Sequence, residues 1–478
     1  MEFITYEMFG AAGNGVTDDM PAIVRAHEEA NRLSLPVKAK AGAIYYISPK
    51  KYTAIIQTSA DWTGAKFIID DRECEDRNAA LFMVTTREEP VELEISALHR
   101  GQTELDNPYG KELYVVLRND NHMDYIRKGL NQNNGTARTD NFILRADGTI
   151  PSPVSFDFDE VTSVSAVPVD TEPLTITGGE FTTIANQWVS EYAYHARNIV
   201  VRRSNTDIGG ITHLITGELD HGAPYSGFIS VNGCAHVCIH DCVFTGHKIY
   251  STIGNAGKPV QMGSYDIGLG MASDVSLLRC RQTTDILDRG YWGLIGTNYC
   301  RDLLLEDCHF SRFDAHQGVI NCTLRRCTLG WQCLNAIGSG TFLLEDTEAY
   351  GGALVNLRSD YGSTWNGDMI IRNCIWHPLW DRRSVFAGWN DATHDFGYDC
   401  YLPQNVIIDG LTIAEDHTDD RPLAIFNNYL GDADIPADER KYMPAPPVSV
   451  KVRNIHTRRP VILCEKPELM PDTEWISE

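Results

Sequence analysis

The C-terminal two-thirds of the chain repeats one short phrase, and this repeat restricts the possible folds more than any other feature. Each copy has an apolar, often β-branched run, then two polar residues, then a small or apolar residue that is most often Cys. The clear copies end at Cys242, Cys280, Cys308, Cys327, Thr347 and Cys374, and weaker copies end at Gly179, Ser204, Leu411 and Ile455. The shortest spacing, 19 residues from Cys308 to Cys327, leaves room for three short strands and three turns. The repeat therefore predicts the coils of a parallel β-helix, about ten or more of them.

Equivalent residues of stacked coils lie one above another at the strand spacing of about 4.8 Å, so each repeat position forms a ladder. Five clear copies carry Cys at the same position, where it behaves as a small apolar side chain. We therefore expect the 13 cysteines to be mainly reduced thiols of the core. The longest coil, 44 residues from Leu411 to Ile455, and others near that length carry loops that we expect to form the walls of a groove.

Charge and hydropathy exclude several partners. The chain has 41 basic and 65 acidic residues, a net charge of −24, which argues against nucleic acid as a partner because phosphate binding needs basic patches. An anionic substrate is not excluded, since a local cluster of basic residues can override the global sign. No apolar run reaches the roughly 18 residues of a membrane span, so we expect no membrane partner. The N-terminus has no signal peptide pattern, which predicts a cytoplasmic protein as the sequence stands, or a secreted or periplasmic one if a signal was removed.

The N-terminal residues predict a cap for the solenoid. The segment FGAAGNGVTDD, ending at Asp19, leads into MPAIVRAHEEAN, whose apolar residues Ile23, Ala26 and Ala30 have helical spacing. Asp18 or Asp19 is the expected helix cap, and Pro21 suits the first turn. A helix at this place would cover the open N-terminal end of the coils.

This opening segment resembles the start of the pectate-lyase/polygalacturonase-like superfamily of right-handed parallel β-helices. The resemblance rests on Phe9-Gly10-Ala11, Gly13-Asn14-Gly15-Val16-Thr17-Asp18-Asp19, the helix, and a strand and Gly turn after it. It implies the fold, and members of the superfamily include polysaccharide lyases, glycoside hydrolases and phage tailspikes. Beyond Asn205-Thr206-Asp207, the chain lacks the further motifs of polygalacturonases, so the resemblance carries over no catalytic role.

A middle stretch departs from the coil repeat. Segments such as VELEIS, ELYVVLR, DYIRKGL and NFILRAD alternate strictly and are joined by Asn- and Gly-rich turns, as antiparallel strands are. We therefore expect an N-terminal cap with the first coils at 1–90, an inserted antiparallel β subdomain at 91–170, the main β-helix at 171–460 and a C-terminal tail at 461–478.

Four residues are the candidates for catalysis. Aligning LDRGYWGLI with FDAHQGVI places Asp288 beside Asp314, one coil apart, with about 5 Å between their backbones. Two carboxyl groups at that range push their pKa values apart, which provides the acid and the base or nucleophile of a glycosidase. Asp266, one coil earlier, would orient water or hold the partner carboxylate. His316 follows Asp314 by two residues and so points the same way in a strand, as a general base, a proton shuttle or a hydroxyl ligand.

Aromatic and basic side chains in the same coils predict a sugar-binding surface. Flat rings stack on sugars, and an Arg can clamp a carboxylated sugar with two hydrogen bonds. The candidate binding residues are His247, Lys248, Tyr265, Tyr291, Trp292, Arg312, Gln317, Trp331, Asn335, Arg358 and Asp360, with Trp365 as a further aromatic residue.

Three functions are consistent with these residues. The first is a glycoside hydrolase that uses Asp288 and Asp314 on a carbohydrate substrate and needs no metal or cofactor. The second is a polysaccharide lyase acting on an acidic, uronate-containing glycan, with His316, Lys248 or Arg312 as base and Ca²⁺ held by Asp266, Asp288 and Asp314. The third is a tailspike-like structural protein that binds glycans, although the superfamily signature begins within ten residues of Met1 and so leaves little room for a preceding module. The sequence sets no oligomeric state.

Overall fold

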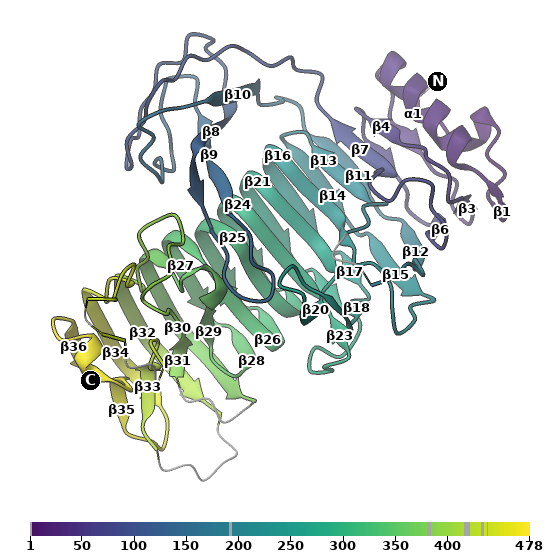
Figure 1. The fold of residues 1–478 in the computed structure, drawn as a ribbon. Coiled ribbons are helices and arrows are strands. Elements are labelled where there is room, and N and C mark those ends of the chain that lie inside the picture. Colours follow the sequence, from purple (N-terminus) through teal and green to yellow (C-terminus); the bar gives the residue numbers. More distant parts are fainter. Residues whose placement is uncertain (1, 191–193, 380–383, 415–420, 432–434, 437) are drawn as a thin grey trace.

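The chain forms a right-handed parallel β-helix, and Figure 1 shows its coils stacked from the N-terminal helix to the C-terminus. The computed structural model describes residues 2–190, 194–379, 384–414, 421–431, 435–436 and 438–478. Each complete coil contributes strands to three walls, named wall 1, wall 2 and wall 3 in the order in which β13 (Ile199–Arg202), β14 (Thr206–Gly209) and β15 (Thr212–Thr216) follow one another. The fold predicted from the repeat is confirmed.

The strands of the three walls pair in parallel from coil to coil. Wall 1 contains β4 (Ala54–Ile56), β7 (Phe82–Thr85), β13 (Ile199–Arg202), β16 (Ser226–His240), β21 (Tyr265–Leu278), β24 (Leu294–Glu306), β25 (His309–Arg325), β26 (Thr328–Ala336), β29 (Val355–Leu357), β31 (Ser384–Ala387), β33 (Leu423–Phe426) and β35 (Val461–Cys464). Wall 2 contains β2 (Val37–Lys38), β5 (Ala60–Asp61), β11 (Leu174–Thr177), β14 (Thr206–Gly209), β27 (Gly338–Glu345), β30 (Trp365–Pro378), β32 (Asn405–Ile413), β34 (Ser449–His456), β36 (Glu474–Ser477) and the C-terminal parts of β16, β21, β24 and β25. Wall 3 contains β1 (Asn14–Asp18), β3 (Ile44–Ile47), β6 (Lys66–Asp70), β12 (Glu180–Ile184), β15 (Thr212–Thr216), β17 (Val243–Phe244), β22 (Arg281–Gln282), β28 (Glu348–Gly351) and the ends of several longer strands. A short 3₁₀ helix, η3 (Pro467–Leu469), follows β35.

The repeated phrase encodes the corner between walls 2 and 3. Its second polar residue has a left-handed backbone in each clear copy, with φ of 53° at Asp241, 55° at Asp307 and 49° at Asp346. The following ladder residue bonds back to the strand it leaves: Cys308 Sγ donates to the Glu306 carbonyl at 3.5 Å, and Thr347 Oγ1 donates to the Glu345 carbonyl at 2.9 Å. All 13 cysteines are free thiols and 12 of them are buried, as the ladder predicted.

The N-terminal end is covered as expected. The 3₁₀ helix η1 (Tyr6–Phe9) and the helix α1 (Met20–Leu33) lie across the first coils (Figure 1). Ile23, Ala26 and Ala30 are fully buried. Asp18 accepts the Met20 N–H at 3.3 Å, whereas Asp19 accepts the N–H groups of Ala12 and Gly13 and so orders the preceding turn. No helix in the described part of the chain is long and apolar enough to cross a membrane.

The inserted subdomain is an antiparallel sheet with a core of its own. It consists of β8 (Leu113–Asp124), β9 (Thr136–Leu144) and β10 (Ser163–Pro168), with β8 in the centre. Of the strands expected at 91–96 and 124–130, the first forms only an isolated bridge at Val91, and the second is the turn that joins β8 to β9. That turn, residues 125–135, is called the hairpin tip below.

Contacts with the solenoid hold the hairpin tip over wall 1. Arg301 of β24, only 1% exposed, donates to the Asp140 carboxylate at 2.6 Å and to the carbonyls of Asn141 and Pro153. Nearer the tip, the Lys128 N–H donates to the Asp360 carbonyl at 2.9 Å. Asp360 belongs to the 3₁₀ helix η2 (Ser359–Tyr361), which directly follows wall 1 strand β29. The insertion therefore leans over the outer face of wall 1, as Figure 1 shows.

A two-stranded pair from successive coils and a small hairpin line the opposite edge of wall 1. β18 (His247–Lys248) pairs with β23 (Tyr291–Trp292), and β19 (Tyr250–Ile253) pairs with β20 (Pro259–Met262), both antiparallel. They lie in the loops between walls 3 and 1. The longer coils thus project loops that flank wall 1, as their length predicted.

Candidate functional site

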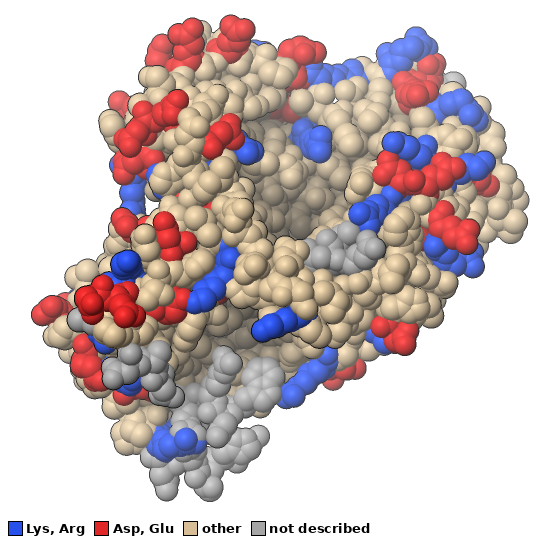
Figure 2. Space-filling view, in the orientation of Figure 1, with Lys and Arg blue, Asp and Glu red and all other residues tan. Residues whose placement is uncertain are grey.

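Two adjoining hollows occupy the outer face of wall 1, and Figure 2 shows this face of the molecule recessed between the inserted subdomain and the coils. The charged pocket, of about 140 Å³, is lined by Arg127, Asn131, Tyr194, Val260, Gln261, Gly263, Tyr265, Trp292, Leu294, Arg312, Asp314, His316 and Arg358. The amide pocket, of about 450 Å³, is lined by Arg312, Trp331, Gln332, Cys333, Asn335, Gly351, Gly352, Ala353 and Asn356. Arg312 lines both, so the two pockets form one groove along wall 1.

The register of wall 1 decides which residues form the floor of the groove. Gly296 of β24 pairs with Asp314 of β25, which pairs with Asn335 of β26, which pairs with Asn356 of β29. The neighbouring column, from Ile295 to Phe313, Leu334 and Val355, points inward and is buried. Because side chains alternate along a strand, the polar column faces the groove.

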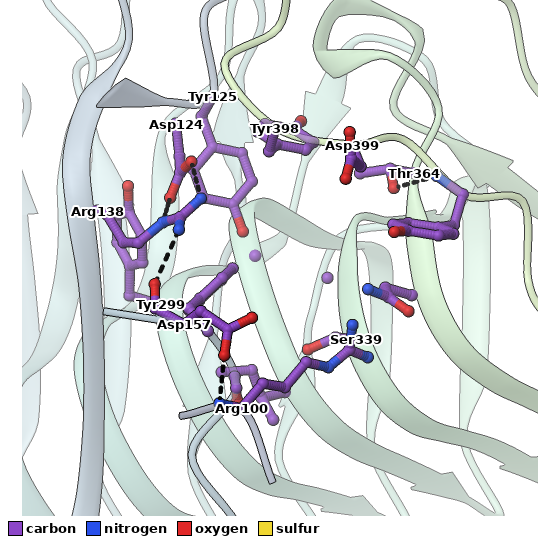
Figure 3. A pocket seen from close by; sticks show the side chains of 17 residues that line it. Arg100, Asp124, Tyr125, Arg138, Asp157, Tyr299, Ser339, Thr364, Tyr398 and Asp399 are labelled. Atoms are coloured by element: carbon purple, nitrogen blue, oxygen red, sulfur yellow. Dashed lines mark hydrogen bonds and ion pairs between the residues drawn. The ribbon is translucent and has the colours of Figure 1, made fainter. Parts of the chain in front are cut away.

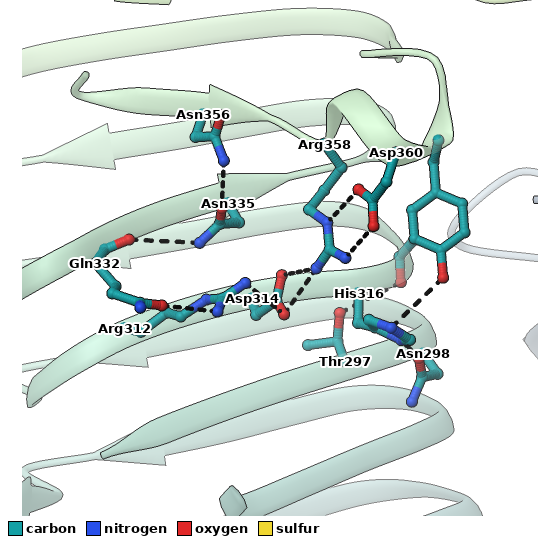
Figure 4. Close-up of polar contacts among 12 residues, drawn as sticks. Thr297, Asn298, Arg312, Asp314, His316, Gln332, Asn335, Asn356, Arg358 and Asp360 are labelled. Atoms are coloured by element: carbon teal, nitrogen blue, oxygen red, sulfur yellow. Dashed lines mark hydrogen bonds and ion pairs between the residues drawn. The ribbon is translucent and has the colours of Figure 1, made fainter. Parts of the chain in front are cut away.

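The floor of the charged pocket is an ion-pair cluster centred on Arg358 (Figure 4). Nη1 of Arg358 donates to both carboxylate oxygens of Asp314, at 2.6 and 2.8 Å. Its Nε and Nη2 donate to the carboxylate of Asp360, at 2.9 and 2.7 Å. Nη2 of Arg312 lies 2.9 Å from Asp314, and Nε of Arg127 donates to Asp360 at 2.7 Å. Each carboxylate therefore lies between two guanidinium groups.

These guanidinium groups keep both carboxylates ionised. Burial acts to raise the pKa of Asp314, but Arg312 and Arg358 outweigh it and lower that pKa to about 2. Burial is also outweighed at Asp360, where Arg358 and Arg127 hold the pKa well below its usual range. Neither carboxyl group can therefore supply a proton near neutral pH.

His316 is a neutral imidazole with a defined tautomer. It is the extra residue of a β-bulge, because Thr297 and Asn298 of β24 pair with Ala315 and Gln317 on either side of it. Its Nδ1 lies 3.0 Å from the side-chain oxygen of Asn298, an acceptor, so Nδ1 carries the proton and Nε2 is the basic nitrogen. Burial, reinforced by Arg358, lowers the pKa of His316 to about 3.

Nε2 of His316 faces donors at long range. Nη1 of Arg127 lies 3.5 Å away and the Tyr361 hydroxyl lies 3.4 Å away. Hydrogen bonds of this length are weak, so a ligand can replace them. The basic nitrogen thus points toward the groove beside three arginines.

Arg312 lines both pockets, and its Nε–H is a hydrogen-bond donor that a ligand could use. Its guanidinium lies 4.8 Å from the ring centre of Trp292 and donates to the Gln332 side chain at 2.8 Å. Its Nε is buried without a hydrogen-bond partner in the part of the chain that the structure describes. Within the cluster, the three guanidinium groups of Arg127, Arg312 and Arg358 face the two carboxylates of Asp314 and Asp360, which leaves one positive charge in excess.

Asp266 lies outside this cluster, in a second buried polar group. Its Oδ2 accepts the Leu294 N–H at 3.1 Å, and its Oδ1 lies 3.9 Å from Nε2 of His247. Nδ1 of His247 lies 3.3 Å from Glu218. Burial raises the pKa of Asp266 to about 6, although the nearby His247 acts to lower it. Asp266 and His247 are almost completely buried, so neither forms the surface of the groove.

The predicted pairing of Asp288 with Asp314 is wrong. Asp288 is exposed in the turn between β22 and β23, where its carboxylate accepts the Gly290 N–H at 2.8 Å. The alignment of Asp288 with Asp314 set Leu294 opposite Ile320, but Leu294 pairs with Arg312 and Ile320 pairs with Arg301. The predicted calcium pocket of Asp266, Asp288 and Asp314 fails for the same reason, and no cluster of potential metal ligands is found among the described residues.

The other predicted residues divide between the groove and its surroundings. Those that line the two pockets are Tyr265, Trp292, Arg312, Asp314, His316, Trp331, Asn335 and Arg358. Asp360, by contrast, accepts hydrogen bonds from Arg358 without lining either pocket. Lys248 of β18 and Tyr291 of β23 are backbone pairing partners at the groove edge. The side-chain amide of Gln317 donates to the Thr136 hydroxyl of the insertion at 3.0 Å. Trp365 is fully buried in the core, because wall 2 strand β30 points its first side chain inward.

Several members of the site were not predicted, among them Arg127 and Tyr361 beside the ion-pair cluster and Asn131, Tyr194, Gln332 and Asn356 of the pocket linings. Arg127 belongs to the hairpin tip, far from the coils in sequence, and only the folded insertion brings it to Asp360. Tyr361 lies beside His316, with Arg127 and Arg358 over its ring at 5.2 and 5.4 Å. The pair Asp360-Tyr361 within NLRSDYG is the sequence signal that would have identified it.

A further hollow of about 210 Å³ lies on the other side of the insertion (Figure 3). Arg138 donates to the Asp124 carboxylate there at 3.0 and 3.1 Å, and Asp157 accepts the backbone N–H of Arg100 at 2.9 Å. These contacts lie within the insertion, and the rest of the lining, including Tyr299, Ser339 and Tyr398, comes from the solenoid.

Comparisons with known proteins show the fold. No protein-family model matches this sequence, and no curated protein is significantly similar to it. Among solved structures, the tailspike protein gp49 of Pseudomonas phage LKA1 has a TM-score of 0.60 at 12% identity, covering 95% of this chain and 81% of its own. The gp61 tailspike of Pseudomonas phage phi297 has a TM-score of 0.52 at 11% identity over 96% and 81% of the two chains. The gp54 tailspike of Acinetobacter baumannii bacteriophage AP22, solved with a capsular saccharide, has a TM-score of 0.53 at 9% identity over 99% and 79%. The chain has the parallel β-helix fold that the sequence resemblance implied.

Proposed function

We propose that this protein is a carbohydrate-active enzyme that cleaves an acidic polysaccharide in the groove of wall 1. The observation that carries the proposal is the excess positive charge on the groove floor, in a protein whose net charge is −24. A buried charge without a full complement of opposite charge is costly, and an anionic ligand would compensate it. The spare Nε of Arg312 is a donor for such a ligand.

The rest of the groove has the chemistry of sugar recognition. Trp331 lines the amide pocket, and flat rings of this kind stack on sugar faces, whereas the ring of Trp292 in the charged pocket supports the guanidinium of Arg312. In the amide pocket, Asn356 donates to Asn335 at 2.5 Å, which holds a ladder of amide groups against the groove. Amides offer both donors and acceptors to sugar hydroxyl groups.

The reaction that suits this geometry is β-elimination at a uronate. A base removes the proton on the carbon next to the carboxylate, the bond to the glycosidic oxygen on the neighbouring carbon breaks, and a carbon–carbon double bond forms. We assign the base role to Nε2 of His316, and the arginines neutralise the carboxylate, so the proposal needs no calcium. The departing oxygen takes a proton from solvent and His316 later releases its proton to solvent, so protons balance.

Substrate binding would strengthen this base. Burial and the charge of Arg358 lower the pKa of His316 in the free protein. A bound carboxylate compensates the excess positive charge, so the pKa of His316 rises toward its ordinary value only when substrate is present. Hydrolysis by paired carboxylates is less well supported, because Asp314 and Asp360 are both ionised and neither supplies the required acid.

A second candidate function is glycan binding without cleavage. The three solved structures compared above are tailspikes, and one of them contains a capsular saccharide. In this case the same groove would hold the glycan, and His316 would be a hydrogen-bonding group.

The test is a digestion panel of acidic and neutral polysaccharides, with and without EDTA, that follows reducing ends and the ultraviolet absorbance of unsaturated uronates. We expect the absorbance to rise on an acidic glycan, to persist in EDTA and to be lost in His316→Gln. The control is His309→Gln, which changes an exposed histidine of the same strand on wall 3. Reducing ends without absorbance would show hydrolysis, binding without cleavage would support the second candidate, and neither binding nor cleavage of any acidic glycan would overturn both.

A further inference from the structure

The groove is bridged at one place, where the hairpin tip meets the β19–β20 hairpin. The Ala256 N–H, in the β19–β20 turn, donates to the Leu130 carbonyl in the hairpin tip at 2.9 Å. Gly254 packs against Asn131 so closely that a Cβ at position 254 would overlap the side-chain oxygen of Asn131. These residues come from opposite edges of wall 1. Together they form an arch over the groove, and the bridge across the recess is visible in Figure 2.

Both sides of the arch reach down into the charged pocket. Arg127 and Asn131 line it from the hairpin tip, and Val260 and Gln261 line it from β20. The tip is fixed from below, because the Lys128 N–H donates to the Asp360 carbonyl and the Lys128 side chain pairs with Asp391. The charged pocket therefore has a roof as well as a floor.

Aromatic rings line the charged pocket under the arch. A Cβ at Gly296 would overlap the ring of Tyr265, so this ring packs against the floor beside the position that pairs with Asp314. A Cβ at Gly263 would likewise overlap the ring of Trp292. Tyr194 contacts Tyr265 with ring centres 5.9 Å apart. On the side of the N-terminal coils, the rings of Tyr265 and Trp292 therefore stand at the charged pocket where the glycines leave them room.

The opposite direction is open. Past Arg312 the groove continues into the amide pocket, which is the larger of the two and has the amides of Asn335 and Asn356 on its floor. A glycan lying on wall 1 can extend toward the C-terminal coils. It would meet the arch and the rings if it extended the other way.

We propose that the charged pocket receives the end of a glycan chain, with an anionic terminal sugar held by the arginines and the following sugars lying in the amide pocket. This inference rests on the proposed acidic-glycan function. It adds that the enzyme removes short units from one terminus and does not cut at internal positions.

The binding test uses an acidic oligosaccharide that carries a bulky fluorophore at one terminus or at the other, compared with the unlabelled oligosaccharide. A label at the terminus that enters the charged pocket should weaken binding at least tenfold, and a label at the other terminus should leave binding unchanged. Equal binding of both labelled forms would overturn the inference. This comparison does not depend on cleavage.

The cleavage test follows product sizes by chromatography from the earliest times on a long acidic polysaccharide. We expect one short product and a slowly shrinking polymer, whereas an early ladder of many lengths would contradict the inference. Absence of any cleavage would instead contradict the proposed reaction, and the labelled oligosaccharides would still decide whether a chain end is bound.

A deletion provides the matched variant. Removing Ala256 leaves Asn255 and Gly257 as a two-residue turn, which antiparallel hairpins favour, and it removes the donor to Leu130. The arch should loosen and longer products should appear early. The control Ala256→Ser keeps the turn length and the N–H group, and should give the product pattern of the unchanged protein.

Discussion

Arg358 compensates two buried carboxylates at once, since it bonds to both Asp314 and Asp360. Removing one partner of a buried ion pair leaves the other charged and unpaired, at a cost of about 3–5 kcal/mol. We therefore expect Arg358→Gln to lower the free energy of unfolding by roughly that amount and to abolish binding of acidic glycans. Denaturant unfolding and a glycan titration measure the two effects.

The control for this variant is Arg372→Gln on wall 2. Arg372 pairs with Glu345 at 3.8 Å, and its side chain is 47% exposed, so solvent screens the pair. Its loss should change stability little and leave glycan binding intact. Equal stability of the Arg358 and Arg372 variants would show that the cluster does not depend on Arg358.

The proposed base predicts a particular pH dependence. His316 must be unprotonated to accept a proton, and its pKa is about 3 in the free protein. The acid limb of kcat/KM, which reports the free enzyme, should therefore lie well below the ordinary histidine value of about 6.5. The acid limb of kcat reports the complex and should lie at higher pH, because bound carboxylate compensates the arginines. Coincident acid limbs in the two profiles would contradict this role of the arginines.

The polar residue types that follow the Cys ladder were enough to predict most of the ion-pair cluster and His316. Arg312, Asp314, His316 and Arg358 were predicted because they follow the ladder in successive coils, and the structure brings them together. Asp288 was misplaced because the match between two short segments ignored that one of them is a turn. Polarity alone does not show whether a polar residue lies in a strand or in a projecting loop.

Among the structural elements, the corner between walls 2 and 3 is the one that recurs most regularly. Asp346 has φ of 49° there and is exposed, and a left-handed backbone costs residues other than Gly roughly 1–2 kcal/mol. We expect Asp346→Gly to stabilise the protein by about 0.5–1 kcal/mol, since Gly also loses some unfolded-state entropy. Thermal and denaturant unfolding measure the gain.

The neighbouring residue gives the contrast for this prediction. Glu345 ends β27 with extended pairing to Arg372 of β30, so Gly brings no backbone advantage there. Glu345→Gly should destabilise the protein and also lose the ion pair with Arg325 at 2.8 Å. If both glycine variants were destabilising, the left-handed corner would not carry the strain that we assign to it.

At the level of elements, the repeat predicted coils but not their register. β25 carries a bulge at His316, and register shifts also interrupt its pairing with β26 and β27. A bulge inserts one residue without changing the apolar pattern on either side, so periodicity does not reveal it. The sequence could therefore predict which segments form the outer face of wall 1, but not which residues of neighbouring strands lie side by side there.

For the whole molecule, the sequence predicted the solenoid, its N-terminal cap and an inserted antiparallel sheet. It did not predict that the insertion completes the site. That outcome depends on Arg301 fixing the insertion to β24 and on Asp360 receiving Arg127 and the Lys128 N–H. Such contacts join residues more than 100 positions apart, and no local pattern encodes them.

Acid sensitivity is a property of the whole molecule, because its buried histidines are spread along the solenoid. Burial lowers the pKa of His27 to about 3 and that of His195 to about 4, and holds the pKa of His213 well below its ordinary value. These groups stay neutral in the fold but take up protons in the unfolded chain below about pH 6.5, so stability falls as pH falls. Asp71 and Asp266 act in the opposite direction below about pH 6, since burial raises the pKa of each to about 6.

His27 allows one such contribution to be measured by itself. It lies on the buried face of α1, fully buried, and its Nε2 lies 3.1 Å from the Tyr6 hydroxyl. His27→Gln keeps a hydrogen-bond acceptor for Tyr6 but cannot titrate. Between about pH 7 and pH 5 the unchanged protein should lose about 2 kcal/mol more stability than the variant, which is 1.36 kcal/mol for each unit that pH falls below the unfolded pKa. Denaturant unfolding at the two pH values gives the difference, and parallel losses in both proteins would mean that His27 is protonated in the fold.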